Sequence, residues 1–351
     1  MIAVLSSIVF VYVGSAAGSP DGESLNVLEC DTETGAVRIV QTVKGYVGTT
    51  YFQVDGAGKR LVTAFLEQKD GKKLSRLAAF PIGAGGRLGE MVPLSLLPCE
   101  APCHVALSPD GSLVAFAAYT SATVGVAPAA GGAALTRVLP DVGMGDFPGR
   151  QKKAYAHFAF FTPDGSRVGF VDLGCDRIHF FDPASMERDE KLCVRADRGD
   201  GPRHAVWSRD GRFLFVLNEL SNTVMSFAFD GGSFRRIGKW STLPEGFEGS
   251  TKAAAIKLAG DGKILMASNR GCDSIAFFAV DCASGRLERR NVAMLKGPFP
   301  RDFELVPGEK FMVVGHKRSN EIQVYRFDRA ACTLEPAGAP VKAWMPLCFK
   351  F

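Results

Sequence analysis

The sequence predicts an all-β fold, a seven-bladed β-propeller with four antiparallel strands in each blade. Three observations predict it. A short turn motif recurs along the chain, each repeat shows the same order of apolar strands, and the two chain ends hold strand-like segments that complete one more repeat. A repeat of this length with four short strands per unit is typical of propeller blades.

The recurring turn is rich in Gly and Asp, the residues that tolerate the dihedral angles of tight turns. Its last residue falls at positions 58, 111, 165, 211, 262 and 309, so successive motifs are 46 to 54 residues apart. No compositional break or linker interrupts the series. We therefore expect a single domain over residues 1–351.

One repeat shows the internal order of the strands. An apolar strand, His204–Ser208, leads into the turn at Asp210-Gly211, and a second apolar strand follows at Phe213–Leu217. Thr223–Phe229 then alternates as a third strand, and a variable fourth strand follows Asp230. Four strands joined by short turns predict an antiparallel sheet.

Six motifs account for six blades, so the seventh must be composite. Its expected parts are Val9–Val13, Leu25–Cys30 and the C-terminal segment Pro346–Phe351. Pairing the two chain ends would remove an open sheet edge. An alternative interpretation treats residues 1–8 as a remnant of a targeting segment, but no basic region precedes the apolar stretch, which favours the strand.

Composition sets the broad class. The chain has 351 residues, 46% hydrophobic and 22% charged, with a net charge of +4 that is spread along the sequence. The sequence has no block of basic residues that would indicate binding to nucleic acid. The apolar N-terminal stretch is too short to span a membrane as a helix. An odd count of nine cysteines without a zinc-ligand pattern predicts free thiols, no metal and no cofactor. We expect a cytoplasmic monomer or weak dimer, with export as the alternative.

Ionisable residues recur at two positions of the repeat. In a blade, residues that precede the innermost strand and residues that follow the second strand meet at the same mouth of the ring. Eight residues before the end of a motif lie His157, Arg203 and Arg301, and seven or eight residues after it lie Tyr119, Asp172, Asn218, Glu219, Asn269, Arg270, His316 and Lys317. Three arginines at one mouth predict an anionic substrate that neutralises them.

These residues stand in segments that resemble one enzyme family. The segments are Tyr155–Phe158, Gly201-Pro202-Arg203-His204 followed by Asn218–Asn222, Ala267–Gly271, and Pro300–Phe303. Together they resemble the lactonase-family seven-bladed propellers typified by 6-phosphogluconolactonase and carboxymuconate lactonizing enzyme. The resemblance runs from about Val11 to Phe351.

The resemblance implies lactone chemistry without a metal or cofactor. It carries over His157, Arg203, Glu219 and Arg270 as the catalytic group. The residues expected to bind substrate at the mouth are His104, Tyr119, Asp172, His204, Asn218, Asn269, Arg301 and Asp302. Glu219 or His157 would be the general base, and the arginines would hold the anion and stabilise the oxyanion.

Three functions stay open at the level of sequence. The first is hydrolysis of an anionic sugar lactone, as in 6-phosphogluconolactonase of the pentose phosphate pathway. The second is cyclisation of a carboxylated muconate, and the third is a non-catalytic propeller that binds a partner. Two repeats depart from the family pattern, at Gly48–Tyr51 and Tyr119–Ala122, and leave the substrate open.

Overall fold

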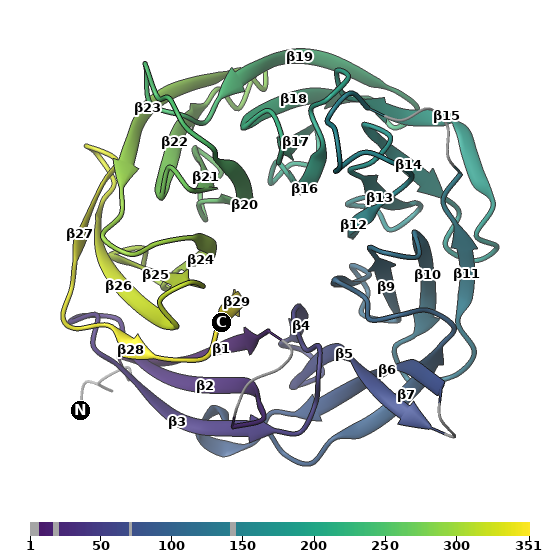
Figure 1. Ribbon diagram of the computed structural model, residues 1–351, viewed down its shortest axis with the longest axis horizontal. Helices are drawn as coiled ribbons and strands as arrows, with labels where there is room; N and C mark the ends of the chain where they lie inside the picture. Colours follow the sequence, from purple (N-terminus) through teal and green to yellow (C-terminus); the bar gives the residue numbers. More distant parts are fainter. Residues whose placement is uncertain (1–6, 17–20, 70–71, 141–144) are drawn as a thin grey trace.

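Seven antiparallel sheets are arranged as blades around a central axis in the computed structural model (Figure 1). The structure describes residues 7–16, 21–69, 72–140 and 145–351. Within them, one short 3-10 helix, η1 (Ala84–Gly86), accompanies the strands. The prediction of an all-β, seven-bladed propeller is confirmed.

We number the blades around the ring and give each from its inner to its outer strand. Blade 1 is β29 (Pro346–Lys350), β1 (Ile8–Ser15), β2 (Glu23–Asp31) and β3 (Val37–Lys44). Blade 2 is β4 (Phe52–Asp55), β5 (Arg60–Lys69), β6 (Lys72–Pro81) and β7 (Val92–Leu97). Blade 3 is β8 (His104–Leu107), β9 (Leu113–Ala118), β10 (Thr123–Pro128) and β11 (Leu135–Val138).

The remaining blades follow the chain in the same order. Blade 4 is β12 (Ala156–Phe161), β13 (Val168–Asp172), β14 (Arg177–Phe181) and β15 (Arg188–Arg195). Blade 5 is β16 (Pro202–Trp207), β17 (Phe213–Asn218), β18 (Thr223–Phe229) and β19 (Phe234–Ser241). Blade 6 is β20 (Lys252–Leu258), β21 (Ile264–Arg270), β22 (Ser274–Val280) and β23 (Leu287–Met294). Blade 7 is β24 (Pro300–Leu305), β25 (Phe311–His316), β26 (Glu321–Asp328) and β27 (Thr333–Pro336), with β28 (Val341–Lys342) also pairing with β26.

Blade 1 is built from both ends of the chain, as the sequence predicts. The C-terminal strand β29 pairs antiparallel with β1, which pairs in turn with β2, and the C-terminus lies beside β1 in Figure 1. This pairing closes the ring and occupies the edge of β1. Residues 1–6, most of the segment considered as a targeting remnant, lie outside the described residues.

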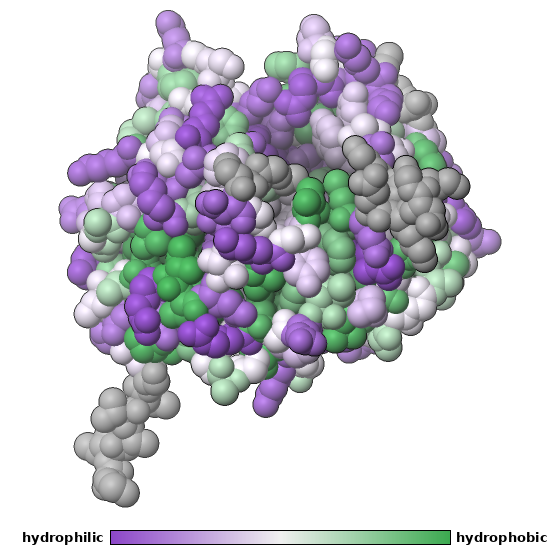
Figure 2. All heavy atoms as spheres, turned by 60° about the horizontal axis from the view of Figure 1, so that its bottom comes forward, coloured by the Kyte–Doolittle hydropathy of each residue, from purple (hydrophilic) through white to green (hydrophobic). Residues whose placement is uncertain are grey.

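The hydrophobic core is divided among the contacts between neighbouring blades. Seven clusters of buried side chains occur among the described residues, and each joins two adjacent blades. Between blades 5 and 6, for example, Phe215 and Leu217 share a cluster with Ala267 and Phe278. The ring is therefore held by a closed series of nearest-neighbour contacts, and Figure 2 shows mostly hydrophilic side chains with smaller hydrophobic patches on its outer side.

Several inner strands carry a β-bulge near their first residue, and three of these bulges concern the candidate residues at the mouth. The register shifts between Ala156 and Phe158 in β12, between Pro202 and His204 in β16, and between Pro300 and Asp302 in β24. The inserted residues are His157, Arg203 and Arg301. Because a bulge re-aims a side chain and interrupts pairing, these three residues are positioned differently from ordinary strand residues.

Within the described residues, no helix has the length and hydropathy required to cross a lipid bilayer.

Candidate active site at one mouth of the ring

Glu219 is the centre of the cluster that the sequence predicts. It follows the last residue of β17, and its backbone amide donates to Gly201 O at 2.7 Å. Its Oε2 atom accepts from Arg203 Nε at 3.0 Å and lies 2.9 Å from Arg270 Nη2. Residues from blades 5 and 6 thus meet at one carboxylate, as equivalent positions of the repeat predict.

A third guanidinium completes the cluster. Arg150 Nη2 donates to Glu219 Oε1 at 2.6 Å and to the Tyr119 hydroxyl at 3.4 Å. Arg150 lies in the connection between β11 and β12, outside the repeated unit. Gln151 anchors this connection by donating from Nε2 to Leu173 O and Asp176 Oδ1, both at 2.8 Å.

Arg203 and Arg270 are fixed by backbone carbonyl groups as well as by Glu219. Arg270 Nη2 donates to Ala253 O at 2.7 Å and its Nε donates to Lys252 O at 3.3 Å. Arg203 Nη1 donates to Ala254 O and lies 3.0 Å from His204 Nε2. Both guanidinium groups are held in one orientation before any ligand binds, which is the preorganisation that electrostatic catalysis requires.

The electrostatics of the cluster are dominated by positive charge. Burial disfavours the charged Glu219, but the charges of Arg270 and Arg203 outweigh it and lower its pKa. Burial and the neighbouring Arg270 and Arg301 lower the pKa of Arg203 to about 9. Three guanidinium groups contact one carboxylate, so the cluster retains excess positive charge, and an anion is the ligand that would relieve it.

His157 is a neutral imidazole beside this charge. Burial and the charge of Arg203 hold its pKa well below the usual value. Its Nδ1 atom is buried and has no hydrogen-bond partner among the described residues. The ring packs edge-on against Tyr119, with centroids 5.5 Å apart, and lies 5.4 Å from the ring of His204. A neutral imidazole can accept a proton, whereas a protonated one cannot.

His104 and His204 continue the row of rings along the inner strands. The His104 ring lies 3.9 Å from both Tyr51 and Phe158, and 5.8 Å from His204. The Ala159 amide donates to His104 Nδ1 at 3.3 Å, while His104 Nε2 is buried without a partner among the described residues. Both histidines are buried on inner strands, and burial lowers both pKa values well below normal.

Asp302 has a different environment from Arg301, its neighbour in sequence. Its Oδ2 atom accepts from the Phe349 amide at 3.0 Å, and its Oδ1 lies 3.5 Å from Lys257 Nζ. The bond with Phe349 fastens the C-terminal strand β29 to β24, and the contact with Lys257 joins β24 to β20. Its hydrogen bonds therefore serve ring closure, and the substrate-binding role predicted from sequence has no support in this geometry.

Three further residues predicted at the mouth make hydrogen bonds to nearby turns and connections. Asp172 Oδ1 accepts from the backbone amides of Tyr155, Gly174 and Cys175 at 2.8 to 3.2 Å. Asn269 binds Thr242 and Ser274, and Asn218 Nδ2 donates to Thr223 Oγ1. A side chain that satisfies its own turn has little capacity left for a ligand, so these positions fit local structure better than binding.

The cluster also includes two residues that the sequence interpretation missed. Cys103 lies eight residues before Gly111, the same repeat position as His157, and its Sγ lies 3.3 Å from His157 O. Repeat numbering could have found it. Burial raises the pKa of this thiol to about 11, which favours the neutral thiol over the nucleophilic thiolate. Arg150 had no such signal, because it lies in a connection between blades that is longer than the others and does not follow the repeat numbering.

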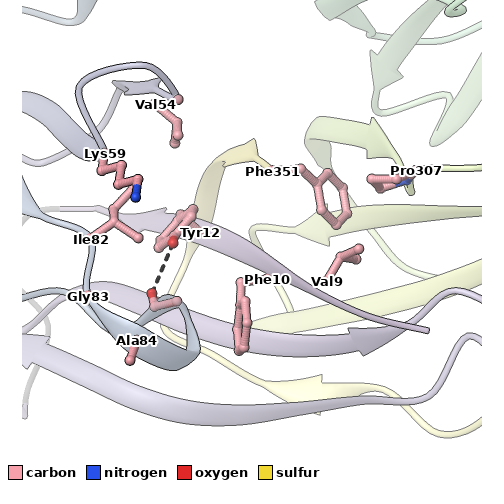
Figure 3. Close-up of a pocket in the computed structure, with 12 residues that line it drawn as sticks. Val9, Phe10, Tyr12, Val54, Lys59, Ile82, Gly83, Ala84, Pro307 and Phe351 are labelled. Carbon is pink, nitrogen blue, oxygen red and sulfur yellow. Dashed lines mark hydrogen bonds between the residues drawn. The ribbon is translucent and has the colours of Figure 1, made fainter. Parts of the chain in front are cut away.

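A separate apolar cavity of about 730 Å³ lies at the other end of the inner strands (Figure 3). Val9, Phe10, Ile82 and Phe351 line it, and the Tyr12 hydroxyl beside it donates to Gly86 O at 2.9 Å. It contains no carboxylate, imidazole or guanidinium group. The candidate groups for lactone chemistry therefore lie at the opposite mouth.

In the described part of the chain, no group of three or more His, Cys, Asp or Glu side chains is placed to hold a metal ion.

Comparison with known proteins agrees with this architecture. The family model described as "Lactonase, 7-bladed beta-propeller" matches residues 10–351. The chain belongs to this lactonase family. Membership extends over all seven blades, so the cluster around Glu219 is the mouth of a lactonase-family propeller.

One relative and two solved structures match this lactonase-family chain over nearly its whole length. A 6-phosphogluconolactonase of Bacillus subtilis is 29% identical over 349 residues, which are 97% of this chain and 98% of the relative. A periplasmic gluconolactonase of Pseudomonas aeruginosa has a TM-score of 0.87 at 26% identity, over 98% of this chain and 99% of its own. A structure titled as a putative 6-phosphogluconolactonase of Bacteroides fragilis has a TM-score of 0.86 at 26% identity, over 99% of both chains.

Proposed function

We propose that this lactonase-family propeller hydrolyses an anionic sugar lactone of the 6-phosphogluconolactone type at the mouth that holds Glu219. The observation that carries the proposal is the contact of three guanidinium groups with one buried carboxylate, next to a neutral His157. Such a site attracts an anion and also holds a base. The names of the relatives, 6-phosphogluconolactonase and gluconolactonase, support the substrate class.

In the proposed reaction His157 is the general base. Glu219 is a poor base, because its pKa is lowered and both oxygens accept hydrogen bonds from arginines. His157 takes a proton from water, and the water oxygen attacks the carbonyl carbon of the lactone. The resulting tetrahedral oxyanion is stabilised by the guanidinium groups. Its collapse breaks the bond to the ring oxygen, which leaves as a hydroxyl group with the proton returned by His157.

Glu219 is assigned the task of orienting the arginines. It accepts hydrogen bonds from Arg150 and Arg203 and forms an ion pair with Arg270. It therefore holds together three guanidinium groups that would otherwise repel one another. Nη1 of Arg150 and Nη1 of Arg270 make no hydrogen bond to a described residue. These atoms are the donors that we assign to the oxyanion or to the substrate's own charge.

The test is an initial-rate assay with the freshly prepared phosphosugar lactone, corrected for spontaneous hydrolysis. His157→Gln removes the proton shuttle and is expected to lower kcat by about 10²- to 10⁴-fold, the usual contribution of a general base. Glu219→Gln should lower kcat/KM by about 10²-fold or more, because the arginines lose their common anion. Circular dichroism spectra identical to wild type would show that the fold is kept.

Carboxymuconate is the second substrate in the same assay. Turnover of the muconate with none of the lactone would replace hydrolysis by cyclisation. If neither substrate is turned over, the remaining interpretation is a non-catalytic propeller that binds a partner. Full lactonase activity in the His157→Gln, Glu219→Gln double variant would refute the assignment of the residues.

The proposal includes reaction without a metal, so turnover should survive incubation with EDTA followed by desalting. It also includes a cytoplasmic location, which the nine free cysteine thiols support.

A further inference from the structure

The mouth holds cationic side chains that do not pair with Glu219. Arg301, the bulge residue of β24, makes no hydrogen bond or ion pair with any described residue, and it is partly buried. Burial and the charge of Arg270 lower its pKa to about 10. A partly buried guanidinium without an acceptor is costly unless a ligand supplies one.

Three more cations gather close to Arg301 around the ring of Phe299. Arg318 lies with Cζ 4.4 Å from the ring centroid, Arg270 with Cζ at 5.5 Å, and Lys317 with Nζ at 5.9 Å. Burial and the charges of Arg301, Arg270 and Arg318 lower the pKa of Lys317. Among these four cations, Arg270 alone pairs with a described carboxylate, that of Glu219.

The backbone holds this group in a strained arrangement. Phe299 has φ of +62°, a left-handed conformation that a residue with a large side chain rarely adopts. Its amide donates to Asp273 Oδ1 at 2.8 Å, and its carbonyl accepts from the Lys317 amide at 3.1 Å. These bonds keep the segment before Arg301 against the end of β25. Strain that is maintained by surrounding contacts is a feature of ligand sites.

We propose that Arg301, Lys317 and Arg318, arranged around Phe299, form the subsite for the phosphate group of a phosphorylated sugar lactone. The proposal rests on the proposed function and assigns its two anionic parts to different places. The lactone carbonyl lies among Arg150, Arg203, Arg270 and His157, and the phosphate lies on the side of blade 7. A phosphate dianion matches several unpaired cations better than a single carboxylate does, because it offers more acceptor oxygens and more charge.

Selectivity is the quantity that tests the subsite. The ratio of kcat/KM for 6-phosphogluconolactone to that for unphosphorylated gluconolactone is measured for the wild type, Arg301→Met and Lys317→Met. Each substitution should lower this ratio by about 10- to 100-fold, the effect of losing one charge-assisted hydrogen bond to a substrate. The loss should be mainly in KM. Arg235→Met, on the exposed face of β19, removes the same charge elsewhere and should leave the ratio as in the wild type.

A binding measurement separates this subsite from the catalytic proposal. Calorimetry with 6-phosphogluconate, the hydrolysis product, requires no turnover, and binding should weaken by at least 10-fold in Arg301→Met. If the wild type is inactive on both lactones but binds 6-phosphogluconate through Arg301, the proposed function fails and the subsite stands. A ratio near 1 in the wild type, or equal losses for both lactones in Arg301→Met, would overturn the subsite.

Discussion

At the scale of the residue, His157 shows how environment sets a chemical role. Burial and the positive charges of Arg203, Arg301 and Arg270 both disfavour the protonated imidazole, so His157 stays neutral. Glu219, in the cluster beside His157, is kept ionised by Arg270, Arg203 and Arg150. One residue is therefore suited to accept a proton, and the other is suited to hold cations in place.

The pH dependence of turnover tests that division. Because the pKa of His157 is lowered, the neutral base persists well below pH 6.5. We expect kcat/KM to stay flat from pH 8 to 6.5 and to fall only in more acidic solution, as His157 takes up a proton. Initial rates corrected for spontaneous hydrolysis at each pH give the profile. An acidic limb with its midpoint at or above pH 6.5 would mean that His157 is not the base, or is not buried as described.

At the scale of the element, the repeat explains both what the sequence revealed and what it concealed. Glu219 and Arg270 could be placed together because they hold equivalent positions of two neighbouring blades. The bulges that aim His157, Arg203 and Arg301 leave no recognisable mark in sequence. Arg150 was missed because it lies in the longest connection between blades, where the repeat numbering gives no equivalent position.

The contacts of Asp302 could not be predicted from sequence, for a related physical reason. The repeat numbering gives the position of a residue along the inner strand but not its hydrogen-bond partner. The partner of Asp302 is the amide of Phe349 in the C-terminal strand, which is distant in sequence. Such a contact depends on how the chain ends meet. Closure itself could be predicted from Val9–Val13 and Pro346–Phe351, but the hydrogen bond that fastens it could not.

A turn between the second and third strands gives a prediction about stability. The residue there has a left-handed conformation in five blades: Ala122, Asp176, Asn222, Asp273 and Asn320, with φ between 49° and 55°. Asn tolerates this conformation, Gly adopts it without strain, and Ala does so at a cost of about 1 kcal/mol or more. Asn222→Ala should therefore lower the free energy of unfolding by about 1–2 kcal/mol, and Asn222→Gly by less.

Urea denaturation of both variants beside the wild type is the measurement. The order of the two variants matters more than the size of either change, since both lose the hydrogen bonds of the Asn222 side chain to Leu220 O and Thr251 O. If the Gly variant were the less stable of the two, backbone strain would not be the reason for Asn at this turn.

At the scale of the whole molecule, the ring brings histidines from three blades into one buried row. His104, His157 and His204 come from blades 3, 4 and 5, and burial lowers the pKa of each well below its ordinary value. In the unfolded chain each would bind a proton near pH 6.5, but in the folded ring each stays neutral to lower pH. The folded state therefore binds fewer protons than the unfolded state just below pH 6.5.

The sign of the effect follows from that difference. Stability contributed by neutral burial is complete above pH 6.5 and is lost as the pH falls toward the folded pKa values, at about 1.4 kcal/mol per pH unit for each histidine. Denaturation curves between pH 7.5 and 5.5 should show this loss, and His104→Gln should make the slope shallower, because one of the contributing imidazoles is removed. A free energy of unfolding that stays constant over this range would contradict the burial of these rings.

The central claim is that one mouth of the ring binds the two ends of a phosphorylated lactone at separate clusters of cations. Electron density of crystals grown with 6-phosphogluconate tests it most directly. We predict that the carboxylate of this product lies among Arg203, Arg270 and His157, and that its phosphate lies against Arg301 and Lys317. Density for the product at the opposite end, in the cavity lined by Phe10 and Phe351, with an empty mouth, would contradict the account.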